Sequence, residues 1–297
     1  MLALSEEQER YFIFSKHRLT NVAAMSNQET LIFLHIPKTA GTTLSIALAK
    51  WFQPDELYHI RSGNHDGAPQ FSPHFGPEET FCSLPTAERA RFRCVLGHTK
   101  FGLHKAIPGP AKYFTMLRNP LDRYVSQVAQ YNRMVKRGEI DSQSCQVTLN
   151  EYRKIKPVYF RNPQTRWISG IRGAGFWSRE ESEVLALAKQ HLAEWFSIVG
   201  VVEQIEQSMA LLAAYCDKPV PVIDRENVSS VRPSVDEFTA VQLDEFKANN
   251  RLDEELWQYA RQSLQSQNTA LFQSGKLALR QRLLRPFKKI ARKLKAA

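Results

Sequence analysis

Cysteine is scarce in this chain of 297 residues, and the four that occur are scattered without paired spacing: Cys82, Cys94, Cys145 and Cys216. This excludes a disulfide framework and favours free thiols in a reducing compartment. No Cys/His cluster has the spacing of zinc ligands, so the sequence predicts no metal site. Internal repeats are also absent, which excludes a solenoid or an array of modules.

Long apolar runs are absent as well. No run approaches the roughly 20 residues that a membrane span needs. The N-terminus, residues 1–10, is acidic and lacks the basic start and apolar centre of a signal peptide. These two absences predict a soluble, cytoplasmic protein. Residues 1–28 are polar and are expected to form a helical extension.

An excess of positive charge is absent from most of the chain. The net charge is +10, but nine of the 40 Lys and Arg residues lie in 276–297, which contains no acid; 31 bases therefore face 30 acids before it. The balanced body gives no indication of a nucleic-acid partner. In the tail, one helical face carries Leu283, Phe287, Ile290 and Leu294. This pattern is typical of a helix lying on an anionic membrane, and a solvated basic tail is the alternative.

The chain is organised around residues 31–44. Leu31–Leu34 is an apolar run suited to a buried parallel strand, and residues 42–52 carry apolar side chains at helical spacing. Between them, Pro37–Thr43 is a turn of small residues with one lysine. Such a turn directs backbone N–H groups and the positive end of the helix dipole to one point, so it predicts an anion site.

Three further apolar runs predict strands that alternate with helices: residues 94–99, 113–117 and 196–202. The sequence therefore predicts an α/β fold, a P-loop-like three-layer sandwich with a mainly parallel central sheet flanked by helices. We expect this domain to cover residues 29–265 and the basic tail to cover 266–297. Residues 53–85, 156–175 and 218–234 are expected to be irregular connections.

The phosphate loop of most nucleoside triphosphatases reads Gly-x-x-x-x-Gly-Lys-[Ser/Thr], with the lysine after the second glycine. This pattern does not occur in the chain, and in the present loop Lys38 precedes Gly41. The order His-Ile-Pro-Lys-Thr-Ala-Gly-Thr-Thr instead resembles the 5′-phosphosulfate loop of sulfotransferase family 2, which contains heparan sulfate 2-O- and 6-O-sulfotransferases and bacterial relatives. The resemblance covers about residues 30–260. It implies 3′-phosphoadenylyl sulfate as donor and adenosine 3′,5′-bisphosphate as product. It assigns the donor's 5′ end to Lys38, Thr39, Ala40, Gly41, Thr42 and Thr43.

A second motif, Arg118-Asn-Pro-Leu-Asp-Arg-Tyr-Val-Ser126, follows the strand at 113–117. It is similar to the family pattern Arg-[Asn/Asp]-Pro-x-x-Arg-x-x-Ser, which implies that Arg118 and Ser126 hold the donor's 3′-phosphate. A planar guanidinium gives bidentate phosphate contacts. The alternative is a capped amphipathic helix with a surface arginine, since Asn119 can cap the helix and Pro120 suits its first turn.

His98 is the candidate base, because an imidazole can accept the proton that an attacking hydroxyl loses. Its Gly-His segment is similar to that of the 2-O-sulfotransferases. A second histidine found in some members is replaced by Leu96, so we expect any auxiliary role at His104. A structural histidine is the alternative for His98. We expect Lys38 to neutralise charge on the leaving oxygen, and His35 to be structural.

Two weaker segments complete the predicted site. Residues 162–166 resemble a family segment near the active site, so Arg166 is a candidate for donor phosphate or an anionic acceptor. Residues 227–230, followed by Arg232, resemble a late loop over the nucleotide, which assigns Ser229 and Arg232 to the donor. Both segments can also be ordinary polar loops.

The resemblance implies a carbohydrate O-sulfotransferase that acts on a polysaccharide, oligosaccharide or glycolipid, and we expect it to need no metal. The sequence does not define the acceptor. Two alternatives remain: a nucleotide-dependent phosphotransferase, and a non-catalytic nucleotide- or membrane-binding protein. The first is disfavoured by the position of Lys38 relative to Gly41.

Overall fold

The structure, a computed structural model, describes residues 24–61, 72–140, 145–221 and 233–273. Its strands are β1 Thr30–Leu34, β2 Leu57–Ile60, β3 Phe75–Gly76, β4 Cys94–Gly97, β5 Ala111–Leu117 and β6 Phe196–Val201. Its α-helices are α2 Gly41–Ala49, α3 Glu78–Ser83, α4 Thr86–Arg89, α5 Pro120–Lys136, α6 Leu149–Ile155, α7 Pro163–Ser169, α8 Glu181–Trp195, α9 Ile205–Tyr215, α10 Ala240–Asn249 and α11 Arg251–Gln273. Short 3₁₀ turns are η1 Pro54–Glu56, η2 Leu103–Ala106, η3 Pro157–Tyr159, η4 Gly173–Phe176, η5 Val202–Gln204 and η6 Val235–Glu237.

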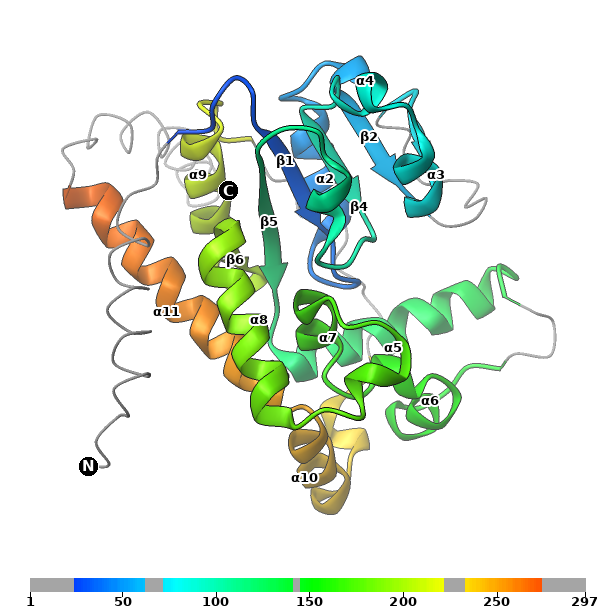
Figure 1. The fold of residues 1–297 in the computed structure, drawn as a ribbon. Coiled ribbons are helices and arrows are strands. Elements are labelled where there is room, and N and C mark those ends of the chain that lie inside the picture. Colours follow the sequence, from blue (N-terminus) through cyan, green and yellow to red (C-terminus); the bar gives the residue numbers. More distant parts are fainter. Residues whose placement is uncertain (1–23, 62–71, 141–144, 222–232, 274–297) are drawn as a thin grey trace, which may run out of the picture.

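Within the described residues the strands form one six-stranded sheet in the order β3-β2-β4-β1-β5-β6, and every pair is parallel. The predicted α/β class with a parallel central sheet flanked by helices is confirmed. From β1 the chain continues to β2 and β3 at one edge of the sheet, returns to β4 beside β1, and then crosses to β5 on the other side of β1. Ligands of open α/β sheets bind at such a reversal, outside the carboxyl ends of the strands. Figure 1 shows β1 and β5 pointing toward α5 and α7.

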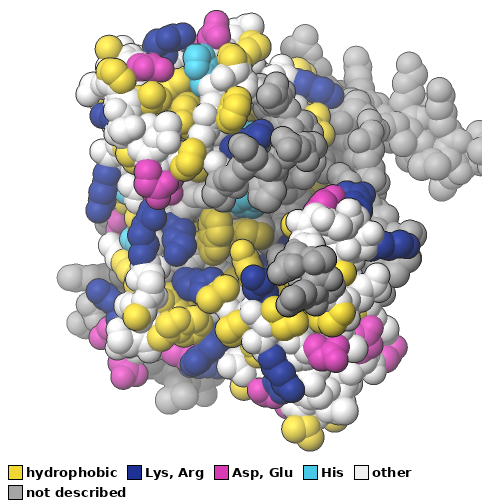
Figure 2. All heavy atoms as spheres, turned by 90° about the vertical axis from the view of Figure 1, so that its right-hand side faces the viewer, with side chains coloured by type: hydrophobic (Ala, Val, Ile, Leu, Met, Phe, Trp, Pro, Cys, Tyr) yellow, Lys and Arg dark blue, Asp and Glu magenta, His cyan; other side chains and the backbone are white. Residues whose placement is uncertain are grey.

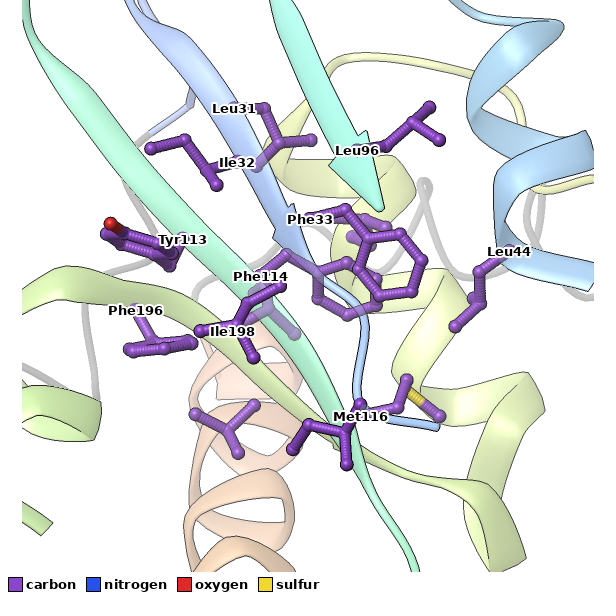
Figure 3. Packing of buried hydrophobic residues seen from close by; sticks show 14 of the residues in the cluster. Leu31, Ile32, Phe33, Leu44, Leu96, Tyr113, Phe114, Met116, Phe196 and Ile198 are labelled. Atoms are coloured by element: carbon purple, nitrogen blue, oxygen red, sulfur yellow. The ribbon is translucent and has the colours of Figure 1, made fainter. Parts of the chain in front are cut away.

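The core lies on both faces of the sheet. On one face Phe33 stacks on Phe114 with ring centroids 5.2 Å apart, and Leu44 of α2 lies beside them (Figure 3). On the other face Tyr113 stacks on Phe196 at 5.0 Å, next to α8. These side chains are fully buried or nearly so, which is why β1 and β5 are apolar along their length rather than alternating.

A second hydrophobic cluster lies beneath α5, at the carboxyl end of the sheet. Its buried members include Tyr124, Val128, Tyr152, Phe160 and Phe246. Tyr124 and Val128 lie on one face of α5 because they are four residues apart. The cluster joins α5 to α6, η3 and α10, and so fixes the helix that carries Ser126.

Two predictions about connections were wrong. Residues 53–85 contain β2 and β3, which form one edge of the sheet, and His59 lies in β2 and is partly buried. Residues 156–175 contain α7. Residues 235–264 are helical and form a 3₁₀ turn followed by α10 and α11. The tertiary pairing of β2 with β4 stabilises a short strand that its own composition does not predict.

Helix α11 runs to Gln273 and so crosses residue 265, where the sequence placed a boundary. Most of the predicted N-terminal extension and most of the basic tail lie outside the described residues. In the part of the chain that the structure describes, none of the helices combines the length and apolarity needed to cross a bilayer.

Candidate active site

The loop after β1 has the backbone of an anion cradle. Lys38 and Ala40 both adopt left-handed conformations, with φ of 72° and 64°. Such angles are uncommon outside glycine and store strain, which concentrates at functional sites. Ala40 precedes α2 and provides no side-chain cap. The N–H groups of the first helical turn have no intrahelical acceptor, so they are donors for an anion.

The residues of this loop contribute unequally. Thr39 is fully buried, and its hydroxyl donates to the Ile36 carbonyl at 2.9 Å, so it stabilises the turn itself. Thr42 is exposed and Thr43 is partly exposed. Gly41 is required by close packing: a Cβ there would lie 1.7 Å from Nε2 of His35.

The second predicted motif meets this loop. Arg118 follows β5, and its Nη1 donates to the Lys38 carbonyl at 3.3 Å. Asn119 caps α5 as predicted, accepting from Leu121 N and Asp122 N at 3.0 and 3.2 Å. Ser126 is partly exposed and lies about 9 Å along the helix axis from Pro120. Arg118 and Lys38, which are 80 positions apart in the chain, are therefore in contact at the carboxyl end of the sheet.

A buried glutamine that the sequence did not reveal fixes the backbone of Arg118. Gln164 in α7 accepts from Arg118 N and donates to Arg118 O, each at 2.9 Å. Its own N–H, like that of Thr165, donates to the carboxylate of Asp253 in α11, at 2.9 and 2.7 Å. Gln164 and Asp253 are fully buried. This chain of contacts links α11 to the site through α7.

A buried arginine lies next to these groups. Arg123 in α5 is 1% exposed and donates from Nη2 to the Tyr159 carbonyl at 2.6 Å. Burial lowers the pKa of its guanidinium to about 10, an effect that the nearby Asp253 carboxylate opposes. Arg123 and Asp253 thus partly compensate each other beneath the site.

His98 follows β4, next to the β1 loop. Gly97 before it has φ of 137°, and a Cβ there would lie 1.9 Å from the Ile60 carbonyl, so only glycine fits. The exposed His98 has Nδ1 3.0 Å from the His35 carbonyl. A carbonyl can only accept, so Nδ1 carries the proton and Nε2 of the neutral ring holds a lone pair. This is the tautomer that a general base acting through Nε2 needs.

Basic residues lie near Lys100, two positions after His98. The Trp167 ring of α7 lies edge-on to His98 at 5.9 Å, and the neighbouring Arg166 donates to the Val158 carbonyl at 2.8 Å. Burial, and then the charges of Arg166 and Arg172, lower the pKa of Lys100. Arg172 also pairs with Glu78. Figure 2 shows Lys and Arg side chains gathered beside apolar ones on the face of the molecule that holds the β2 edge.

Not every predicted residue joins the site. His104 stacks on Trp195 at 3.9 Å and contacts the Tyr113 hydroxyl at 3.0 Å. Tyr113 precedes Arg118 by five residues of extended chain, about 16 Å, so the structure does not bring His104 to the β1 loop. Ser229 and Arg232 lie outside the described residues.

Two cavities flank the sheet. One of about 390 Å³ is lined in part by Glu78, Phe101 and Arg172. The other, about 680 Å³, lies at the opposite, amino-terminal edge and includes Trp51 and Arg93. Neither lining includes a predicted site residue, so neither cavity identifies the candidate site.

The arrangement joins an anion cradle, an arginine and an imidazole at the ends of three neighbouring strands. Such a site can bind a phosphorylated group and remove a proton nearby. Among the described residues no cluster of three His, Cys, Asp or Glu side chains could hold a metal ion. The sequence matches no protein-family model and no curated protein, so the functional assignment rests on this geometry and on the motifs.

Proposed function

We propose that this chain is a sulfotransferase that moves the sulfuryl group of 3′-phosphoadenylyl sulfate to a hydroxyl of a saccharide. The observation that carries the proposal is the contact between the two motifs. Nη1 of Arg118 donates to the Lys38 carbonyl in the first loop, at 3.3 Å. His98 contacts the His35 carbonyl beside the same loop. This contact supports a single donor site to which both motifs contribute.

3′-Phosphoadenylyl sulfate carries anionic groups at both ends, and the chain offers hydrogen-bonding groups and cations for both. The N–H groups at the start of α2, with Lys38, Thr42 and Thr43, suit the 5′-phosphosulfate. Arg118 and Ser126 suit the 3′-phosphate, because a guanidinium can contact two phosphate oxygens at once. The residues present therefore fit this donor.

In the proposed reaction the acceptor hydroxyl oxygen attacks sulfur, and the bond between sulfur and the bridging phosphate oxygen breaks. The hydroxyl proton passes to Nε2 of His98, and the leaving oxygen keeps the bonding electrons on adenosine 3′,5′-bisphosphate. The ammonium of Lys38 and the α2 N–H groups stabilise that developing charge. Loss of one such donor slows comparable reactions by about 10²–10³-fold.

Binding of the product tests the donor site. Calorimetry with adenosine 3′,5′-bisphosphate, in the absence of magnesium, is expected to show one site. Arg118→Ala should weaken binding at least about 30-fold, because truncating one partner of a charged contact costs about 2 kcal/mol or more. Arg137→Ala, an arginine exposed at the end of the same helix, is the matched control and should bind like the wild type.

Transfer from radiolabelled donor to a panel of saccharides tests the reaction. His98→Gln is expected to lower the transfer rate about 10²-fold or more while the bisphosphate affinity stays within a factor of three. Full activity of that variant would remove His98 as base. Preferential, magnesium-dependent binding of a nucleoside triphosphate would instead support a phosphotransferase.

A further inference from the structure

Two histidine rings stack at the carboxyl ends of β1 and β4. The centroids of His35 and His98 are 4.2 Å apart and their planes are inclined by 25°. The same two residues are joined a second time, since His98 Nδ1 lies 3.0 Å from the His35 carbonyl. One residue thus touches both the face and the edge of the candidate base.

The His35 ring is itself fixed from other sides. It lies on Gly41, the first residue of α2, so closely that a methyl group at Gly41 would collide with it. It also stacks on Phe33, with centroids 5.5 Å apart and planes inclined by 12°. A single ring therefore contacts the strand beneath it, the loop of the donor site and the imidazole of His98.

The surroundings of His35 keep it uncharged. Burial, followed by His98, His59 and Lys38, lowers its pKa well below the ordinary value. A neutral ring can stack on His98 without opposing the positive charge that His98 gains when it accepts a proton.

We propose that His35 is a positioning residue, which holds His98 in one ring orientation and one tautomer beside the donor loop. This inference rests on the proposed function for its catalytic meaning. The contacts themselves do not depend on it. The backbone carbonyl of His35 selects the tautomer, and the ring restricts rotation of His98 about its side-chain bonds.

A role in packing alone makes a different prediction. If the His35 ring only filled space, its removal would weaken folding and leave the His98 ring unchanged. If it positions His98, removal frees the His98 ring to rotate, which weakens the bond to the carbonyl and mixes the two tautomers.

Long-range ¹H–¹⁵N spectra of the histidine rings at pH 8 separate these cases. In the wild type the two His98 nitrogens should give widely separated shifts, one protonated and one not. In His35→Ala they should move toward each other, and in His35→Phe, which keeps a planar ring, they should stay apart. Should the alanine variant fail to fold, His35→Leu removes the planar ring with less loss of volume.

His191 is an internal reference in the same spectra. Its Nδ1 lies 3.0 Å from the Ile168 carbonyl, and its ring stacks on Phe101 at 3.7 Å. Its nitrogen shifts should be unchanged in every His35 variant. His191→Ala removes a comparably placed histidine on α8 and should leave the His98 shifts as they are.

Kinetics provide the second measurement. His35→Ala should lower kcat about 10–100-fold, the size of effect expected when a reacting group is misplaced by about 1 Å. The KM for donor should stay within about threefold, and His35→Phe should recover most of kcat. Unchanged His98 shifts in the alanine variant, or an equal loss of kcat in the phenylalanine variant, would overturn the inference. If no form of the protein bound the bisphosphate or transferred sulfate, the proposed function would fail, while the spectra would still decide whether His35 orders His98.

Discussion

At the scale of single residues, Gly41 shows how closely the loop between β1 and α2 is packed. An added methyl group would meet the His35 ring at 1.7 Å, so that ring has to move. We expect Gly41→Ala to lower the free energy of unfolding by about 1–3 kcal/mol, the usual range for overpacking, and to weaken bisphosphate binding. Urea unfolding and calorimetry measure the two effects.

Gly109→Ala is the control for this substitution. The nearest atom to a Cβ at Gly109 is the Gln28 carbonyl oxygen at 3.6 Å, an ordinary contact. Its unfolding free energy should change by less than about 0.5 kcal/mol, as for most surface sites. Equal effects at both glycines would contradict the packing argument.

The partly buried His59 makes stability depend on pH. Burial, and then Arg61 and His98, lower its pKa to about 4. Between that value and the unfolded value near 6.5, the unfolded chain binds a proton that the folded chain does not, so stability rises with pH and is lost as the pH falls. His59→Gln should flatten this dependence by at most about 1.4 kcal/mol per pH unit. Urea midpoints between pH 4.5 and 7 measure it, and parallel curves for both proteins would refute the assignment.

Much of the candidate site could be predicted one residue at a time, because its signals are local. The small residues before α2, the cap at Asn119 and the strand ends before His98 and Arg118 are all visible within a few positions. Gln164 and Asp253 could not be predicted, because they act through partners 46 and 89 residues away. His35 was expected to be structural, since only the folded chain shows its ring between Gly41 and His98.

At the scale of elements, α7 depends on a carboxylate from another helix. Asp253 of α11 accepts from the N–H groups of Gln164 and Thr165 in the first turn of α7 and from the Thr165 hydroxyl. It also offsets the buried charge of Arg123. Asp253→Ala should lower the free energy of unfolding by about 3 kcal/mol, because it leaves buried donors and a buried cation unsatisfied.

The variant should also bind the bisphosphate more weakly, since Gln164 then holds Arg118 less firmly. Glu254→Ala, at the exposed neighbouring position of α11, is the matched control and should change stability by less than about 0.5 kcal/mol. Urea unfolding of the two proteins side by side measures the difference. A comparable loss for Glu254→Ala would show that α11 propensity, not the buried carboxylate, was responsible.

The elements themselves were predictable to different degrees. β1, β4, β5 and β6 are apolar runs and were found, as was α5 with its capped start. β2 and β3 were missed because they are short, contain polar or aromatic residues, and form through pairing with β4 and with each other. α7 was missed because its start is capped from α11 rather than by a residue close to it in the sequence.

At the scale of the whole molecule, the charge is divided between a balanced body and the segment 276–297, which lies outside the described residues. Deleting this segment removes nine positive charges. If it binds anionic membranes, the shortened chain should no longer sediment with vesicles of anionic lipid, because each basic residue near such a surface contributes about 1 kcal/mol. Unaltered sedimentation would rule out the membrane role, and melting temperature checks that the body remains folded.

The contact between Arg118 and the Lys38 carbonyl has a thermodynamic consequence. Because the Arg118 side chain already contacts the loop, it loses little conformational freedom when a phosphate binds. A bound phosphate replaces the neutral carbonyl oxygen next to the guanidinium with an anionic oxygen. The backbone N–H and carbonyl of Arg118 are already held by hydrogen bonds to Gln164. Occupation of the pocket should therefore be driven mainly by enthalpy, with little penalty from lost motion of the arginine.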